Sequence, residues 1–302
     1  MIVRPEMSWL RMVFMIHGTS LERTRLRILA AVLFAALVTA AKKHWGLEGF
    51  TLTALPFTLV GLALSIFLGF RNNAAYDRWW EARKLWGGIV NNTRTFARQA
   101  DLYLEDPDRV RTLVRRTIAW THAVRHHLRG EPTTEGTAEF LGDSEAAAAE
   151  ASTNAPVAVL IGTARLLRED WRAGRLDLYA LAQMEGTLAN LTDLLGGCER
   201  ILKTPVPWPY SVLLHRLVAF YCFALPFGVV QDVGWATPAI TLLVAYAMFG
   251  LDEIGEDIER PFDLDPNSLP LTAIGNTIHR NLAEQIGDPV PPAAKPAAFT
   301  LT

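Results

Sequence analysis

The most prominent pattern in the chain is a set of stretches without charged side chains. Residues 49–70 contain no charged residue over 22 positions, and residues 233–251 contain none over 19. A helix needs roughly 20 apolar residues to cross a bilayer. Two shorter stretches, residues 28–41 and 217–231, become long enough if the flanking Arg and Lys side chains extend to the membrane surface. The pattern therefore predicts four transmembrane helices.

Lys and Arg residues gather on one side of these four stretches. The only Lys or Arg residues in the connection between the first two are Lys42 and Lys43, and Asp232 is the only charged residue between the last two. The basic residues before the first stretch and after the second are Arg4, Arg11, Arg23, Arg25, Arg27, Arg71, Arg78, Arg83, Lys84, Arg94 and Arg98. Since positive flanks tend to stay in the cytosol, we expect both termini and the long middle segment to be cytosolic.

The long middle segment has the pattern of helices and lacks strand signals. We predict helices over residues 110–129, 157–173 and 177–203. In the last of them, apolar residues recur at three- and four-residue spacing and share one core-facing side: Leu181, Met184, Leu188, Leu191 and Leu195. The sequence therefore predicts an all-α protein.

Pattern and composition divide the chain into four parts. In order, they are an N-terminal segment with the first two spans, a cytosolic helical region, the third and fourth spans, and a cytosolic C-terminal segment: residues 1–70, 71–210, 211–255 and 256–302. Within the helical region, residues 131–154 are rich in Thr, Gly, Glu, Asp and Ala, which predicts a flexible insertion. The proline-rich tail from Asp288 onward is predicted to be disordered.

The composition excludes several classes of function. The 302 residues are 50% hydrophobic and carry a net charge of -2, so there is no basic excess for a nucleic-acid partner. Two cysteines, Cys198 and Cys222, are too few for a disulfide framework. The sequence has no glycine-rich phosphate loop, Cys-x-x-Cys pair or His-Glu-x-x-His helix, so we expect neither an enzyme nor a bound cofactor.

His122 and His126 come nearest to a metal site, because they lie four residues apart on a predicted helix. The surrounding residues would repel a cation: Arg115, Arg116, Arg125 and Arg129. We therefore interpret these histidines as solvated or packed, and predict no metal site.

The second predicted span has one bulky side and one nearly bare side. Leu62, Ile66 and Phe70 follow one another at four-residue spacing, and the residues between them include Gly61, Ala63, Ser65 and Gly69. One interpretation is ordinary helix packing, with small residues at the close contacts. The other is a pore, in which several copies of the helix surround an axis and the bulky side chains form hydrophobic rings that dewet.

The helix of this span should continue into the cytosol, since no Gly or Pro follows Phe70 before Arg83. At 100° per residue, Asn73, Asp77 and Glu81 lie within about 60° of the direction of Phe70. A pore lined by Phe70 would then also be lined by carboxylates, which would favour cations. The alternative is that Glu81 forms an ion pair with Arg78 or Lys84.

The same passage resembles the second membrane helix of the bestrophin family. The resemblance consists of Gly69-Phe70 followed by Arg78-Trp79-Trp80, with bulky residues at positions 62 and 66. Further along, Pro261-Phe262 resembles the post-membrane Asn-Pro-Phe-Gly segment of the family in its bacterial form. It follows an acidic helix with Asp252, Glu253, Glu256, Asp257 and Glu259. The resemblance covers about residues 9–282.

This resemblance implies a homopentamer around a central pore in a bacterial inner membrane. It implies a neck lined by Leu62, Ile66 and Phe70, and a second constriction, or aperture, at the start of a cytosolic helix. Asp177 can cap such a helix by accepting backbone N–H bonds, so residues of its first turn are candidates for the aperture. We choose Leu178, with Ala180 as the alternative. Leu178 could instead pack inside its own subunit.

The chain departs from the animal bestrophins where those members help to clasp calcium. Arg260 replaces their Asn, Asp263 replaces their Gly, and only Asp265 remains of the acidic run that follows. Calcium prefers six to eight oxygen ligands, and an arginine supplies none. We therefore expect no calcium activation.

The expected function is a pentameric ion channel that passes monovalent ions, with sodium and potassium favoured over chloride. The alternatives are a chloride or other anion channel of the same architecture, and a non-conducting membrane scaffold. A coupled carrier is disfavoured because such proteins usually need an ionisable group inside the membrane, and the four stretches contain none. The expected partners are other copies of the chain, the lipid bilayer and monovalent ions.

Overall fold

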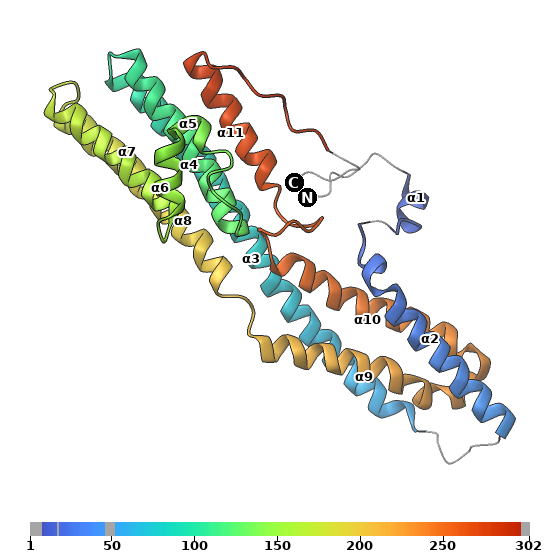
Figure 1. The fold of residues 1–302 in the computed structure, drawn as a ribbon. Coiled ribbons are helices and arrows are strands. Elements are labelled where there is room, and N and C mark those ends of the chain that lie inside the picture. Colours follow the sequence, from blue (N-terminus) through green and yellow to red (C-terminus); the bar gives the residue numbers. More distant parts are fainter. Residues whose placement is uncertain (1–7, 17, 46–51, 297–302) are drawn as a thin grey trace. The chain divides into compact units, whose positions relative to one another are not determined.

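The computed structural model describes residues 8–16, 18–45 and 52–296, and every regular element in these ranges is helical (Figure 1). The all-α prediction is therefore confirmed for the described residues. Residues 46–51, which cover the end of the first predicted external connection and the start of the second predicted span, and 297–302, at the end of the tail, lie outside them. The chain forms two compact units. Among the described residues, we call those from 8–79 and 205–260 the span unit, and those from 80–204 and 261–296 the second unit.

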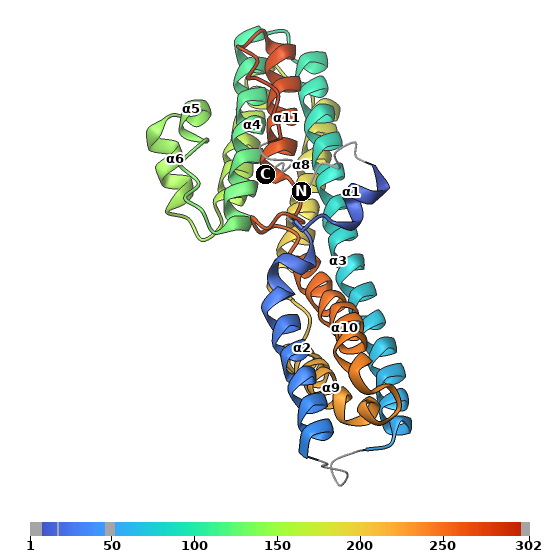
Figure 2. The same ribbon diagram turned by 90° about the vertical axis from the view of Figure 1, so that its right-hand side faces the viewer.

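The span unit is a bundle of long helices that lie side by side (Figures 1 and 2). They are α2 (Ser20–Trp45), the first part of α3 (Ala54–Tyr103), α9 (Trp208–Val233) and α10 (Thr237–Glu259). Its core includes Ile28, Leu64, Leu68, Val218 and Phe249. Close helix approach depends on small residues: a Cβ at Gly61 would clash with Tyr221, and one at Gly228 would clash with Phe57. The short helix α1 (Trp9–Val13) precedes this bundle in the sequence.

Three stretches of the described residues are long and apolar enough to cross a membrane: Ser20–Trp45, Ala54–Tyr103 and Trp208–Glu259. The last of these contains both α9 and α10, which are joined by the 3₁₀ turn η2 (Gly234–Ala236) and pack against each other. The predicted division into four spans therefore stays a prediction.

Arg71 is a charged residue inside the span unit. Its side chain is 1% exposed, and Nη1 donates to Oδ1 of Asp252 at 2.6 Å. His215 contacts the other carboxylate oxygen of Asp252. The sequence analysis counted Arg71 among the basic residues that flank the second span. In the structure it is buried, and α10 supplies a carboxylate directly beside it.

The second unit is built around α4 (Pro107–Arg129), which packs against α7 (Ala155–Arg172) and α11 (Leu271–Ile286). The rest of α3 and α8 (Leu178–Lys203) complete it. Asp106 caps α4 through the backbone N–H groups of residues 108 and 109, and Gly130, with φ 67°, ends the helix.

The core-facing side predicted for α8 is confirmed. Met184, Leu188, Leu191 and Leu195 are all buried, and Leu181 is half-buried. The predicted helix ends of α4, α7 and α8 lie within three residues of those observed.

The segment predicted as a flexible insertion contains two short helices, α5 (Ala138–Leu141) and α6 (Asp143–Glu150), which lie beside α4 (Figure 2). Arg116 of α4 donates to both carboxylate oxygens of Glu145, at 2.7 and 2.6 Å, and to Thr163 of α7 at 3.1 Å. The bond from Arg116 lowers the pKa of the Glu145 carboxyl. A buried guanidinium of α4 thus helps to anchor the insertion, which its composition does not indicate.

The predicted disordered tail has irregular backbone in its described part. Asp288 nevertheless pairs with Arg111 and Arg115 of α4, and the Asn276 side chain donates to the carbonyl of Pro292 at 2.8 Å. Disorder beyond these contacts stays a prediction.

His122 is packed, as the sequence analysis expected. Its ring stacks on Phe140 with an interplanar angle of 9° and meets the ring of His279 edge-on. Burial, followed by the nearby charge of Arg125, lowers the pKa of His122 to about 3. Among the described residues, no group of three or more His, Cys, Asp or Glu side chains could hold a metal ion.

The depressed pKa of His122 predicts an acid-sensitive contribution to stability. The unfolded chain binds a proton near the ordinary histidine pKa of about 6.5, whereas the folded protein does not until about pH 3, so stability falls as the pH decreases through this window. At about pH 5 the loss from this group should be about 2 kcal/mol relative to pH 8. His122→Phe keeps a ring on Phe140 and removes the titration. In denaturant unfolding in detergent, the free energy of unfolding of the variant relative to the wild type should therefore rise by that amount between pH 8 and pH 5. A pH-independent difference between the two would contradict this assignment.

Candidate functional site: pore-lining residues

The three predicted neck residues lie on one exposed side of α3. Leu62, Ile66 and Phe70 are 62%, 49% and 62% exposed. The opposite side of the helix faces the core of the span unit, where Leu64 and Leu68 are buried. A single chain therefore leaves a continuous row of large apolar side chains uncovered. Such a row could face either the axis of a pore or the lipid.

The polar residues predicted to continue this row have different surroundings. Asn73 and Asp77 are exposed in the span unit. Glu81, in the second unit, forms an ion pair with Arg200 of α8 at 2.5 Å. The sequence analysis offered an ion pair of Glu81 with Arg78 or Lys84 as the alternative to pore lining; Glu81 is indeed paired, and the partner that the structure shows is Arg200. Because Arg200 lies 119 residues away along the chain, no local spacing could have identified it.

The start of α8 presents one of the two aperture candidates to the surface. Asp177 caps the helix, and its Oδ1 accepts the backbone N–H of Ala180 at 2.9 Å. Leu178 is 62% exposed, whereas Ala180 is 4% exposed and belongs to the core. Ala180 therefore does not present a side chain to a pore in this structure. Tyr179, which the sequence analysis did not single out, is 86% exposed.

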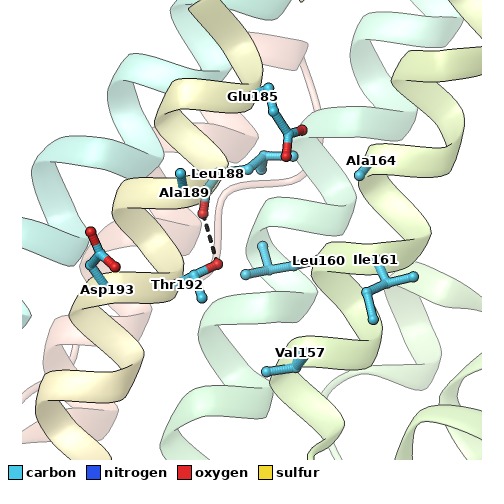
Figure 3. Close-up of a pocket in the computed structure, with 9 residues that line it drawn as sticks. All are labelled: Val157, Leu160, Ile161, Ala164, Glu185, Leu188, Ala189, Thr192 and Asp193. Carbon is cyan, nitrogen blue, oxygen red and sulfur yellow. Dashed lines mark hydrogen bonds between the residues drawn. The ribbon is translucent and has the colours of Figure 1, made fainter. Parts of the chain in front are cut away.

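A groove with a volume of about 320 Å³ lies between α7 and α8 (Figure 3). Its lining is largely apolar, with the carboxylates of Glu185 and Asp193 on α8. The hydroxyl of Thr192 donates a hydrogen bond to the carbonyl of Leu188 at 3.0 Å (Figure 3). The hydrogen bond of Thr192 thus goes to the backbone of its own helix.

The segment that resembles the post-membrane motif is a folded loop in the second unit. The carbonyl of Pro261 accepts the N–H of Leu269 at 2.7 Å, and Arg129 donates to the carbonyl of Phe262. The charge of Asp263 acts on the Arg129 guanidinium. The attraction between these two charges offsets part of the negative potential at Asp263, which disfavours a divalent cation there.

The helices and the exposed row on α3 define a polytopic membrane protein of helical type. The family described as Bacterial/Fungal Bestrophin protein matches residues 1–284, and the chain belongs to the bestrophin family. Bestrophins are ion channels and not enzymes, which agrees with the absence of a catalytic motif in the sequence.

Curated relatives and solved structures match over nearly the whole chain. A protein named voltage-dependent anion channel-forming protein RSc3414, from Ralstonia nicotianae, is 38% identical over 96% of this chain and 95% of its own length. Voltage-dependent anion channel-forming protein YneE from Escherichia coli is 37% identical over 94% and 93%. The crystal structure of a bacterial bestrophin homologue from Klebsiella pneumoniae is 34% identical. It has a TM-score of 0.84 over 87% of this chain and 98% of that chain.

The loop after Phe262 predicts currents that do not depend on calcium. The charge of Asp263 acts on the Arg129 guanidinium, and Arg260, directly before Pro261, supplies no oxygen ligand. Purified channels in a planar bilayer should therefore conduct equally with micromolar calcium and with an excess of chelator. Currents that stop on chelation and return with calcium would show that this loop recruits other oxygen ligands.

Proposed function

We propose that the protein forms a homopentameric ion channel in a bacterial inner membrane, with a hydrophobic neck of Leu62, Ile66 and Phe70. The observation that carries the proposal is the uncovered apolar row on α3, opposite the buried Leu64 and Leu68. Five such rows around an axis would form stacked rings that resist wetting. Membership of the bestrophin family supports this assembly. In the proposed topology, both termini are cytosolic.

The proposed exit constriction is formed by Leu178. Its side chain projects from the first turn of α8 and is 62% exposed, which a core residue would not be. A ring of five leucines would present a short dehydrating barrier to passing ions.

For selectivity, we favour anions. The preference for cations inferred from the sequence depended on free carboxylates along α3, and Arg200 compensates one of these, Glu81. Lys84 lies one turn further along the same side of the helix and is exposed. The names of the curated relatives, which are voltage-dependent anion channel-forming proteins, support the same direction. Asp77 is the remaining exposed carboxylate of the row.

Replacement of the neck residues should widen the pore. The triple variant Leu62→Ala, Ile66→Ala, Phe70→Ala removes most of the apolar bulk, and single-channel conductance should rise about twofold or more because the dewetting barrier falls. A matched control is Leu242→Ala, Leu243→Ala, Tyr246→Ala, which removes three exposed apolar side chains from α10. Equal conductance in both triple variants would remove these residues from the neck. Purified protein that gives no current steps under any ion gradient would indicate the scaffold instead.

A reversal potential measured under a sodium chloride gradient tests selectivity. For an anion-selective channel, the reversal potential lies toward the chloride equilibrium potential. Lys84→Gln should shift it toward the sodium equilibrium potential, because the substitution removes a positive charge from the α3 row. Arg83→Gln is the control, since it removes a neighbouring exposed charge that points about 100° away on the same helix. A wild-type reversal potential near the sodium equilibrium value would refute the anion proposal.

A further inference from the structure

A sharp turn joins α7 to α8 directly before the exposed Leu178. It begins after Arg172, reverses direction at Gly174, where φ is +73°, and ends at Asp177, the cap of α8. A residue with a side chain is strained at this φ, so the glycine is needed to make the turn. The position of Leu178 therefore depends on how this turn is held.

Asp170 holds the turn through its backbone. Its carbonyl accepts the N–H groups of Arg175 at 2.9 Å and Leu176 at 3.3 Å. Leu176 is 3% exposed and so anchors the turn in the core.

Asp170 also holds the turn through its side chain, which is fully buried. Arg175 donates to Oδ1 from Nε at 3.0 Å and from Nη2 at 2.7 Å. On the other side, Nε of Arg109 in α4 donates to Oδ2 at 2.8 Å. The carboxylate thus connects α4, α7 and the turn before α8.

Burying a carboxylate with two guanidinium partners has a large desolvation cost. The attraction within the ion pairs offsets this cost but adds little net stability. What such an arrangement does provide is geometry, because Arg binds a carboxylate with fixed, directional N–H groups. The Arg175 side chain is 46% exposed, so it could be solvated without this bond. Its bond to Asp170 closes the turn on the side from which α8 emerges.

We propose that Asp170 and Arg175 form a latch that positions Leu178 at the exit of the ion path. This proposal rests on the proposed function, in which Leu178 borders that path. Both latch residues act through Leu178 as positioning residues and do not contact the permeating ion. Arg109 keeps Asp170 compensated on the side of α4, so the bond between Asp170 and Arg175 can be removed without leaving an unpaired buried charge.

The experiment compares single-channel conductance and thermal stability in four full-length variants in bilayers and detergent. Arg175→Ala removes the latch, and Arg172→Ala is the matched control, because it removes an exposed arginine from the last turn of α7. Leu178→Ala removes the proposed exit ring, and the fourth variant combines Arg175→Ala with Leu178→Ala. Arg175→Gln serves as a second latch variant if the alanine protein does not fold.

We expect Arg175→Ala to change conductance by about twofold and Arg172→Ala to leave it unchanged, because only the first loosens the exit ring. The effect of Arg175→Ala should disappear when Leu178 is already Ala, since residues that act through one another are not additive. A role confined to stability would instead lower the unfolding temperature of Arg175→Ala without changing conductance, and would overturn the proposal.

Two further outcomes separate the latch from the function on which it rests. If Leu178→Ala leaves conductance unchanged, Leu178 does not border the ion path, and the assignment of the exit fails together with its latch. If Leu178→Ala changes conductance but Arg175→Ala has the same effect in both backgrounds, the exit assignment stands and the latch is overturned.

Discussion

The ion pair between Arg71 and Asp252 fixes how the helices of the span unit meet. Both side chains are nearly inaccessible to solvent, and removal of either would leave a buried charge at a cost of about 3–5 kcal/mol. His215 of α9 contacts the same carboxylate, so Asp252 joins three helices at one level. Gly255, one turn along α10, leaves room for the side chain of Asn72, which a Cβ would displace. These contacts, together with the buried Leu64 and Leu68, hold one side of α3 against the bundle, and Leu62, Ile66 and Phe70 lie on its exposed side.

Ion pairs also change how the carboxylates of α10 are interpreted. In the sequence, α10 carries a dense group of carboxylates that looks available to cations. In the structure, three of these carboxylates form ion pairs: Asp252 with Arg71, Glu253 with Arg27, and Asp257 with Arg23. Since paired carboxylates contribute little field at a distance, formal charge on a helix is a weak guide to ion selectivity. The same holds for Glu81, for which the sequence left pore lining and an ion pair open, and which Arg200 pairs.

The parts of the fold that depend on local pattern could be predicted, and the parts that depend on distant partners could not. Helix bounds followed from periodicity and from caps such as Asp106 and Asp177. The partner of Arg71 lies 181 residues away, and nothing near Arg71 in the sequence indicates it. The insertion at residues 131–154 has the composition of a flexible loop. Its helices are held because Arg116, outside the insertion, reaches Glu145, and composition carries no such information.

The apolar spacing along α8 also distinguishes the two aperture candidates, Leu178 and Ala180. The spacing that predicts the core-facing side of α8 includes Leu181 and Met184, and the buried row also contains Ala180, one turn before Met184. Ala180 precedes Met184 by four residues and Leu188 by eight, so it lies on the same side of the helix, and it is buried with them. Leu178 lies two residues before Ala180, about 200° around the helix, and therefore points away from this core. Extended by one turn, the spacing that identifies the core of α8 also identifies which of the two residues can face an ion.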